Sequence, residues 1–177
     1  MISTEKSIRI AGIAGDSIVD GPGLRLTVFF QGCLRGCAGC HNKDSWPLQG
    51  GQKKTSEALL FEIKKNPLLT GVTFSGGEPL LRAGALLTLA EGIRALGLDL
   101  AIYTGWTIEE IIADGDRDAL ALIGLASVLV DGPFLLGQKS LLLPFRGSKN
   151  QRILDAKRSL SEGRAVLAED PAWSCSP

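Results

Sequence analysis

The sequence predicts an α/β fold, a partial (β/α) barrel of parallel strands that stays open along one side. Strand-like runs alternate with helix-like segments, and this alternation implies parallel strands joined by right-handed helical crossovers. Glycine-rich or polar motifs follow successive strands, which is where α/β folds and barrels place their active sites. The chain has 177 residues, whereas a complete eight-fold barrel takes about 250.

The predicted elements follow one another in a regular order. The first strand covers residues 24–30, which alternate and are rich in β-branched and aromatic side chains. Further strands are predicted at 71–75, 98–103 and 127–130. Helices are predicted at 55–65, with Thr55 as N-cap, and at about 83–96, 108–113 and 119–122. Ile153 and Leu154 begin either a strand or a helix, and the pattern does not decide between them.

Length and composition predict one domain over residues 1–177, with 156–177 as a C-terminal tail whose structure the sequence does not define. Hydrophobic residues make up 45% and charged residues 21%, both ordinary for a globular protein. The 19 basic side chains balance the 19 acidic ones, so no positive excess is available for nucleic acid. No signal peptide or membrane span is evident, which predicts a cytoplasmic protein with reduced thiols.

Three of the four cysteines stand close together after the first predicted strand, at Cys33, Cys37 and Cys40, while Cys175 lies near the C-terminus. A disulfide is disfavoured in a reducing compartment, and a redox pair of Cys37 and Cys40 leaves Cys33 unexplained. Structural zinc, with His41 or Cys175 as fourth ligand, usually joins two separated ligand clusters. Three thiolates also suit an iron–sulfur cluster that keeps one iron open. The spacing favours the iron–sulfur cluster and leaves zinc as an alternative.

Glycines support the cluster interpretation. Gly32, Gly36 and Gly39 interleave with the cysteines, and small residues let a chain turn tightly around a compact group. Gly76-Gly77-Glu78-Pro79 follows the second predicted strand, where it is either a simple turn or a close backbone contact to a ligand. Neither the phosphate-binding glycine loop nor the dinucleotide-binding glycine motif is present in the sequence.

Aromatic residues and the single histidine have modest predicted roles. Trp46, Trp106 and Phe134 are predicted to serve packing. His41, the one histidine of the chain, either stacks on a cofactor ring, hydrogen-bonds near the cluster or makes an ordinary polar contact.

The cysteine spacing, together with Gly76-Gly77-Glu78-Pro79, resembles the radical S-adenosylmethionine (SAM) superfamily. Residues 20–25 (DGPGLR) and 40–42 (CHN) resemble its glycyl-radical-enzyme activase branch. Within that branch the chain is similar to activators of anaerobic ribonucleoside-triphosphate reductases, through the segments 103–106, 131–134 and 145–152. Many superfamily members carry an aromatic residue before the third cysteine, whereas Gly39 stands here; His41 would then take the adenine-side contact.

The resemblance implies a fold of the radical SAM type, a mechanism and a set of site residues. Cys33, Cys37 and Cys40 would hold a [4Fe-4S] cluster whose open iron binds SAM. Reductive cleavage of SAM would give a 5′-deoxyadenosyl radical that takes hydrogen from a glycine of a partner enzyme. The methionine end of SAM would contact Gly76, Gly77 and Glu78, and the nucleoside or an associated cation would contact Gly39, His41, Thr104 and Asp131.

The resemblance also implies the partners. These are a glycyl-radical enzyme, with the anaerobic ribonucleotide reductase favoured, and a one-electron donor such as a flavodoxin or ferredoxin. Asp20 and Arg25 either orient the incoming glycine loop or form a salt-bridged turn. The alternatives are an activase of another glycyl-radical enzyme, a radical SAM enzyme for a small molecule, and a zinc-stabilised interaction module without catalysis.

Overall fold

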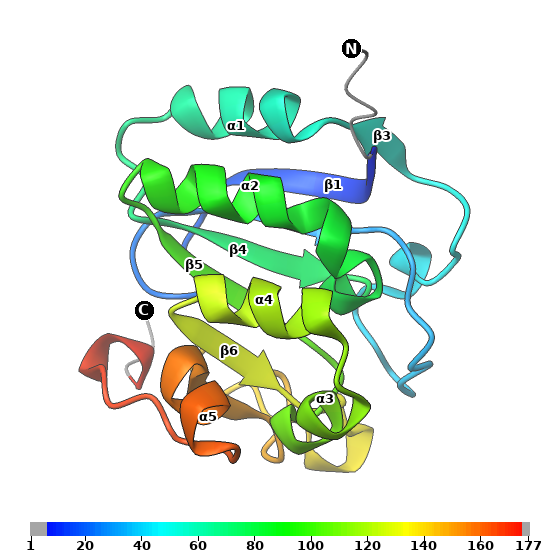
Figure 1. The fold of residues 1–177 in the computed structure, drawn as a ribbon. Helices are drawn as coiled ribbons and strands as arrows, with labels where there is room; N and C mark the ends of the chain where they lie inside the picture. The colour runs from blue at the N-terminus through cyan, green and yellow to red at the C-terminus, as the bar shows by residue number, and fades with distance from the viewer. Residues whose placement is uncertain (1–6, 175–177) are drawn as a thin grey trace.

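The computed structural model describes residues 7–174 and shows one open, seven-stranded mixed sheet (Figure 1). Cys175 therefore lies outside the described residues. The strand order is β3-β1-β2-β4-β5-β6-β7, so β3 and β7 are the free edges. The strands are β1 Ile8–Ser17, β2 Arg25–Phe30, β3 Gln52–Lys54, β4 Gly71–Gly76, β5 Asp99–Tyr103, β6 Val128–Asp131 and β7 Arg152–Asp155.

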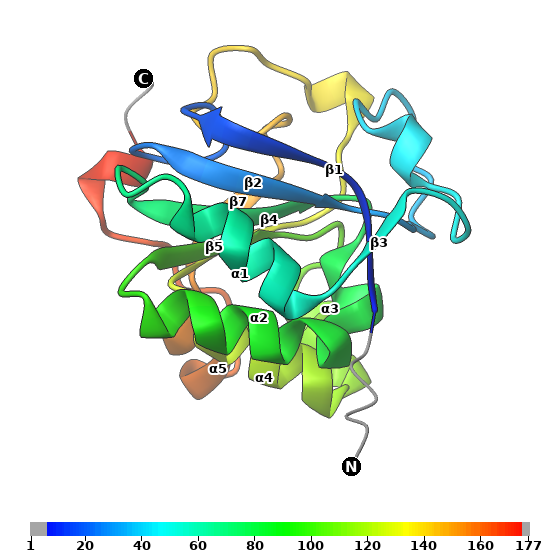
Figure 2. The same ribbon diagram turned by 90° about the horizontal axis from the view of Figure 1, so that it is seen from above.

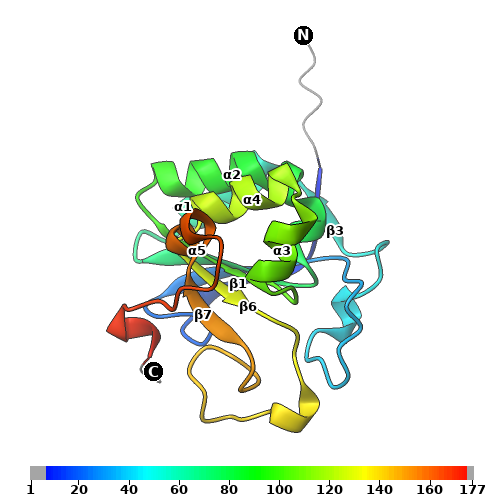
Figure 3. The same cartoon turned by 60° about the horizontal axis from the view of Figure 1, so that its bottom comes forward.

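Four central strands, β2, β4, β5 and β6, are parallel and follow the chain order. Because each new strand is added on the same side of the last, right-handed crossovers place the helices on one face of the sheet. Figures 2 and 3 show that arrangement, with the other face left for loops. The predicted open α/β architecture with a parallel core is confirmed. The helices are α1 Ser56–Lys64, α2 Ala83–Ala95, α3 Ile108–Asp114, α4 Arg117–Leu125 and α5 Ala156–Glu162.

The central strands explain why the sheet has one apolar face and one mixed face. In β4, Val72 and Phe74 pack into the main core under the helices, while Thr73 and Ser75 point to the opposite face. The opposite face has a smaller apolar cluster that includes Val130, Phe145 and Trp173. It is covered in part by the long 132–151 connection, whose Phe145 carbonyl accepts a hydrogen bond from the Tyr103 hydroxyl at 2.7 Å.

Three pairs of neighbouring strands in the sheet are antiparallel, which the prediction of parallel strands does not include. β1 pairs with β2 and β3, and β7 pairs with β6. β1 was not predicted from the sequence because glycine and alanine interrupt its apolar alternation. Its pairing with β2 is also irregular, with register shifts after Ile10 and Ala14. Ile153 and Leu154 belong to β7, which settles the choice between strand and helix.

Residues 156–174 of the C-terminal segment, whose structure the sequence does not define, form regular elements. They include α5, a β-bridge between Leu154 and Leu167, and a short 3-10 turn at Pro171–Trp173. The Trp173 side chain is 4% exposed and joins the apolar cluster on the mixed face. Within residues 7–174, no helix has both the length and the apolar character needed to cross a membrane.

Candidate functional site

The carboxyl ends of β2, β4 and β5 bring three sequence motifs together around one cavity of about 140 Å³. The cysteine loop follows β2, the Gly76-Gly77-Glu78 turn follows β4, and the Thr104-Gly105 turn follows β5. This convergence is the expected property of neighbouring parallel strands. Seven of the predicted site residues line the cavity, namely Cys33, Cys37, Cys40, Gly76, Gly77, Glu78 and Thr104.

The cysteine loop is shaped by glycines that take left-handed backbone conformations. Gly36 has φ of 61° and Gly39 has φ of 75°, and a Cβ at Gly39 would lie 2.8 Å from a methyl group of Leu136. The loop begins with a hydrogen bond from the Cys33 amide to the Trp46 carbonyl at 3.0 Å. At Gly39 a larger residue would collide with Leu136, and at Gly36 the left-handed backbone itself favours glycine.

Backbone amides are directed at the cysteine sulfurs. The Asn42 amide donates to Cys40 Sγ at 3.4 Å. Burial raises the pKa of the Cys33 thiol, while the Arg35 and Gly36 amides act in the opposite direction and the charges of Glu78 and Cys37 raise it further. Amides that approach sulfur stabilise a thiolate, which is the form that binds a metal.

The donor set fits a [4Fe-4S] cluster. The three thiols are free, each is partly exposed, and all line the same cavity. Among residues 7–174, no three His, Cys, Asp or Glu side chains converge as they would around one metal ion. In a cubane each cysteine binds a different iron, so such convergence is not required. Soft thiolates held on one glycine-rich loop match the ligand preference of iron–sulfur clusters.

Gly76 and Gly77 are required because the cysteine loop lies directly against them. The Gly77 amide donates to the Phe30 carbonyl and the Glu78 amide donates to the Gly32 carbonyl, both at 2.8 Å. A Cβ at Gly77 would lie 2.4 Å from the Gly32 carbonyl oxygen, and Gly76 has φ of 90°. The two glycines therefore fix the acid of their motif relative to the start of the cysteine loop.

Glu78 is a buried carboxylate, 3% exposed, that accepts three hydrogen bonds. Oε1 accepts from the Leu80 amide at 3.1 Å and from the Thr104 hydroxyl at 2.9 Å, while Oε2 accepts from the Gly105 amide at 2.8 Å. Burial raises the pKa of Glu78 to about 7 despite these donors. A carboxylate offers about four acceptor positions, so one remains for a donor from a ligand.

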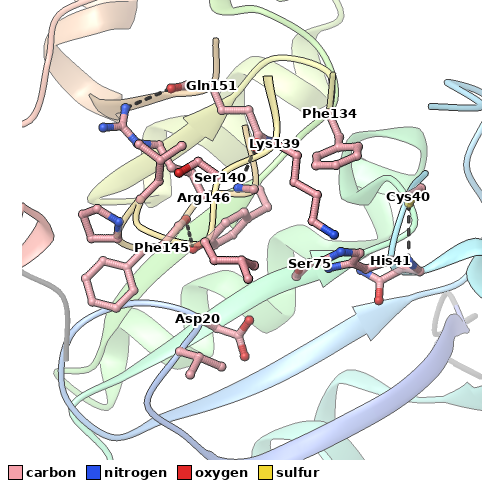
Figure 4. A pocket seen from close by; sticks show the side chains of 17 residues that line it. Asp20, Cys40, His41, Ser75, Phe134, Lys139, Ser140, Phe145, Arg146 and Gln151 are labelled. Carbon is pink, nitrogen blue, oxygen red and sulfur yellow. Dashed lines mark hydrogen bonds between the residues drawn. The ribbon is translucent and has the colours of Figure 1, made fainter. Parts of the chain in front are cut away.

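A larger cavity of about 660 Å³ adjoins the cysteine site on the mixed face of the sheet (Figure 4). Cys40, Ser75 and Tyr103 line both cavities, and the 132–151 connection forms one wall of the larger one. Figure 4 shows Asp20 and Lys139 pointing into this space. His41 lines it as well, with its ring centroid 5.9 Å from that of Phe134. Phe134, which the sequence predicts to serve packing, lines both cavities and contacts the His41 ring.

Asp131 and Gly39 do not line the cavity of the cysteine site. The Asp131 carboxylate is fully buried, accepts from the Ile108 amide at 2.8 Å and pairs with Arg152 at 2.6 Å. It anchors the start of α3 to β7. A contact from either residue to a nucleoside or cation stays a prediction.

Asp20 and Arg25 do not pair with each other. The Arg25 guanidinium is 1% exposed and bonds to Asp99, Thr73 and the Val72 carbonyl at the amino ends of the parallel strands. Asp20 accepts hydrogen bonds from the hydroxyls of Ser17 and Thr27. Arg25 is therefore a structural cation, whereas Asp20 faces the larger cavity.

Two features of the site were not predicted. Arg35 joins the cysteine loop to the β5–α3 connection, and Lys139 with Arg146 contributes cations to the larger cavity. Arg35 lies 70 positions from Gly105 in the sequence, so no local sequence pattern predicts the hydrogen bond between them. The 132–151 connection has little regular structure and gives no periodic signal.

Comparisons with known proteins agree with this geometry. Residues 19–154 match a family model described as a 4Fe-4S single cluster domain. The chain is 35% identical over 142 residues to the anaerobic ribonucleoside-triphosphate reductase-activating protein of Escherichia coli, covering 76% of this chain and 90% of that protein. The corresponding Vibrio cholerae protein is 35% identical over 144 residues, covering 77% and 90%.

Two further similarities cover less of the matched chain. The pyruvate formate-lyase-activating enzyme of Clostridium pasteurianum is 39% identical over 133 residues, which is 70% of this chain and 55% of that enzyme. The crystal structure of QueE from Escherichia coli matches 57% of this chain and 54% of its own with a TM-score of 0.46 and 23% identity.

Proposed function

We propose that this chain, which belongs to the 4Fe-4S single cluster domain family and to that of the anaerobic ribonucleoside-triphosphate reductase-activating proteins, is a radical SAM activase of a glycyl-radical enzyme. The main support for the proposal is that three free thiols and the buried carboxylate of Glu78 line the same cavity. When bound, the [4Fe-4S] cluster and SAM supply the reductive cleavage that yields a 5′-deoxyadenosyl radical.

Cys33, Cys37 and Cys40 are the residues that would hold the cluster. The Asn42 amide, which already donates to Cys40 Sγ, stabilises the thiolate form and keeps its sulfur oriented. Gly36 and Gly39 take the left-handed backbone conformations that let the loop turn between the thiols. Because only three thiolates are provided in this loop, one coordination position is left for the cosubstrate.

Glu78 and its two preceding glycines hold the methionine end of SAM. The free acceptor position on Glu78 suits the positively charged amino group of the cosubstrate, since a buried carboxylate is best neutralised by a cation. The absence of side chains at Gly76 and Gly77 allows backbone approach. Thr104 orients Glu78 through its hydroxyl hydrogen bond of 2.9 Å.

The larger cavity receives the glycine-bearing segment of the partner enzyme. It opens beside Cys40 and His41 and has a volume of about 660 Å³, enough for a few residues of extended chain. Hydrogen transfer needs the reacting atoms near van der Waals contact, so a partner segment must enter this space rather than dock outside it. An open sheet permits such entry.

The favoured partner is the anaerobic ribonucleoside-triphosphate reductase, because relatives carrying that name share 90% of their length with this chain. A one-electron donor of the flavodoxin or ferredoxin kind would supply the electron. A cytoplasmic location stays a prediction. The zinc-stabilised module, the alternative left open by the cysteine spacing, loses its support with membership in a cluster family.

Activation of a formate-lyase-type enzyme is the second candidate, favoured by the 39% identity to the Clostridium pasteurianum activating enzyme. The test incubates the anaerobic, reduced chain and SAM with each purified partner and records the electron paramagnetic resonance (EPR) spectrum. We expect a glycyl radical on the reductase. A radical on the formate-lyase-type enzyme alone would reverse the choice, and SAM cleavage without a protein radical would favour a small-molecule substrate.

A further inference from the structure

Arg35, located between two of the cluster cysteines, reaches out of its loop to the connection between β5 and α3. Its Nε donates to the Gly105 carbonyl at 2.8 Å, and its Nη2 pairs with the Glu110 carboxylate at 3.1 Å. Its guanidinium carbon lies 4.1 Å from the centroid of the Trp106 ring. A hydrogen bond, an ion pair and a stacking contact thus use the guanidinium, whose planar shape allows all three at once.

The connection that receives Arg35 is itself firmly attached to the sheet. The Thr104 amide donates to the Val130 carbonyl at 2.9 Å, and the Trp106 carbonyl accepts from the Gly132 amide at 3.0 Å. Thr107 and Glu110 form a reciprocal capping box at the start of α3. Arg35 therefore binds to a rigid anchor rather than to another flexible loop.

The cysteine loop has its other backbone attachments near its ends. Gly32 and Cys33 donate to the carbonyls of Ser45 and Trp46 at one end. Within residues 34–39, all of them described, Arg35 is the residue whose side chain forms hydrogen bonds and an ion pair with another element. A Cβ at Gly36 would meet nothing within 4 Å, so the loop has open space beside it.

Gly105 links Arg35 to the acid of the site. Its amide donates to Glu78 Oε2 at 2.8 Å, while its carbonyl accepts from Arg35. A Cβ on Gly105 would lie 2.8 Å from Arg35 Cγ and 3.6 Å from Glu78 Oε2. One glycine therefore separates the side chain that fixes the cysteine loop from the carboxylate assigned to SAM.

We infer that Arg35 is a positioning residue that holds the middle of the cysteine loop on the Gly105–Trp106 turn and so sets the cluster cysteines relative to Glu78. This inference rests on the proposed function and adds a residue to it. Loss of Arg35 removes the side-chain attachment of the segment between Cys33 and Cys37. The cluster should then dissociate faster, and its position relative to SAM should become less uniform. Lysine keeps the charge but cannot reproduce the Nε hydrogen bond and the flat stacking on Trp106.

The experiment compares wild type, Arg35→Ala, Arg35→Lys and Glu110→Gln after anaerobic cluster reconstitution. The first measurement is the rate at which iron passes to a chelator, and the second is the change in the EPR spectrum on addition of SAM. We expect iron loss about tenfold faster in Arg35→Ala, the factor of one charge-assisted hydrogen bond. We expect a broadened SAM-induced EPR signal in that variant, and iron loss in Arg35→Lys closer to Arg35→Ala than to wild type.

Arg158→Ala is the matched control, because Arg158 is an exposed, ion-paired arginine on α5. It should retain iron at the wild-type rate. If Arg35→Ala does not fold, Glu110→Gln provides the test. It keeps an acceptor for the α3 cap, replaces the ion pair to Arg35 with a neutral hydrogen bond, and should speed iron loss about threefold.

Two negative results have different meanings. Wild-type iron loss and a wild-type SAM-induced spectrum in the folded variants would overturn the inference alone. A wild-type chain that takes up no cluster would overturn the proposed function and this inference with it.

Discussion

At the scale of single residues, the site depends on the carboxyl group of Glu78, whose burial disfavours its charged form. Glu78 is nearly inaccessible and has no cation within its hydrogen-bond set, although three donors surround it. Burial outweighs those donors and the more distant charge of Arg35, and it raises the pKa of Glu78 to about 7. A bound amino group would relieve this imbalance, which supports the proposal that Glu78 binds a positively charged group of SAM.

The raised pKa of Glu78 predicts a pH dependence of stability. Between its ordinary pKa of 4.5 and about 7, the folded chain retains a proton that the unfolded chain releases. Stability therefore falls as pH rises through this window, by at most about 3 kcal/mol. Glu78→Gln should flatten that dependence, although its amide has one acceptor oxygen in place of two and loses at least one of the three hydrogen bonds at every pH. Chemical denaturation at a series of pH values measures the slope, and equal slopes for wild type and variant would contradict the assignment.

At the scale of elements, the turn after β4 is fixed by contact between two backbones. β2 and β4 pair in parallel register up to Phe30 and Gly76, and the chains then continue in contact through Gly32 and Gly77. The strands were predictable because their apolar side chains alternate. The need for two glycines was not predictable, because it comes from contact with the backbone of residues 29–32. That contact follows from the pairing register of β2 and β4.

A methyl group at Gly77 should therefore be costly. Gly77→Ala places Cβ against the carbonyl oxygens of Gly32 and Phe30, and we expect a loss of about 2 kcal/mol or more in the free energy of unfolding. Gly12→Ala is the control, since a Cβ there meets nothing within 4 Å. Equal unfolding midpoints for the two variants would show that the turn does not need the close approach.

The attachment of α3 to β7 gives a second test at this scale. Asp131→Asn removes the buried charge that pairs with the partly exposed Arg152, and we expect a loss of about 2 kcal/mol in the free energy of unfolding. Glu109 pairs with the same arginine but is 50% exposed, so Glu109→Gln should cost less than about 1 kcal/mol. Denaturant titration separates the two. A small effect of Asp131→Asn would leave this buried carboxylate free for the ligand contact that the sequence suggested.

At the scale of the whole molecule, the order of the strands decides what the site can accept. Helices cover one face of the sheet, and the other face holds the larger cavity beside Cys40 (Figures 3 and 4). The parallel core, the helices on it and the three motifs at its edge were predictable from alternation and spacing. The antiparallel pairings of β1 and β7, the wall formed by residues 132–151 and the Arg35 contact were not, because they depend on packing between distant segments.

The exposed leucines beside the larger cavity predict where the partner docks. Leu141 and Leu142 are 87% and 88% exposed. Changing both to serine should raise the KM for the partner enzyme about tenfold by removing apolar contact area, while SAM cleavage without a partner stays unchanged. Leu68→Ser is the control, since Leu68 is 73% exposed and precedes β4 at the opposite end of the strands. An unchanged KM in the double variant would place docking elsewhere.

Three thiols of one loop are proposed to hold a [4Fe-4S] cluster that leaves one position for SAM. The most direct measurement is the iron and sulfide content of the reconstituted chain together with its reduced-state EPR spectrum, with and without SAM. We expect about four irons and four sulfides per chain, a spectrum that changes on SAM addition, and loss of both the cluster and the spectral change in Cys37→Ala. A cluster spectrum that is indifferent to SAM, or bound zinc in place of iron, would contradict this proposal.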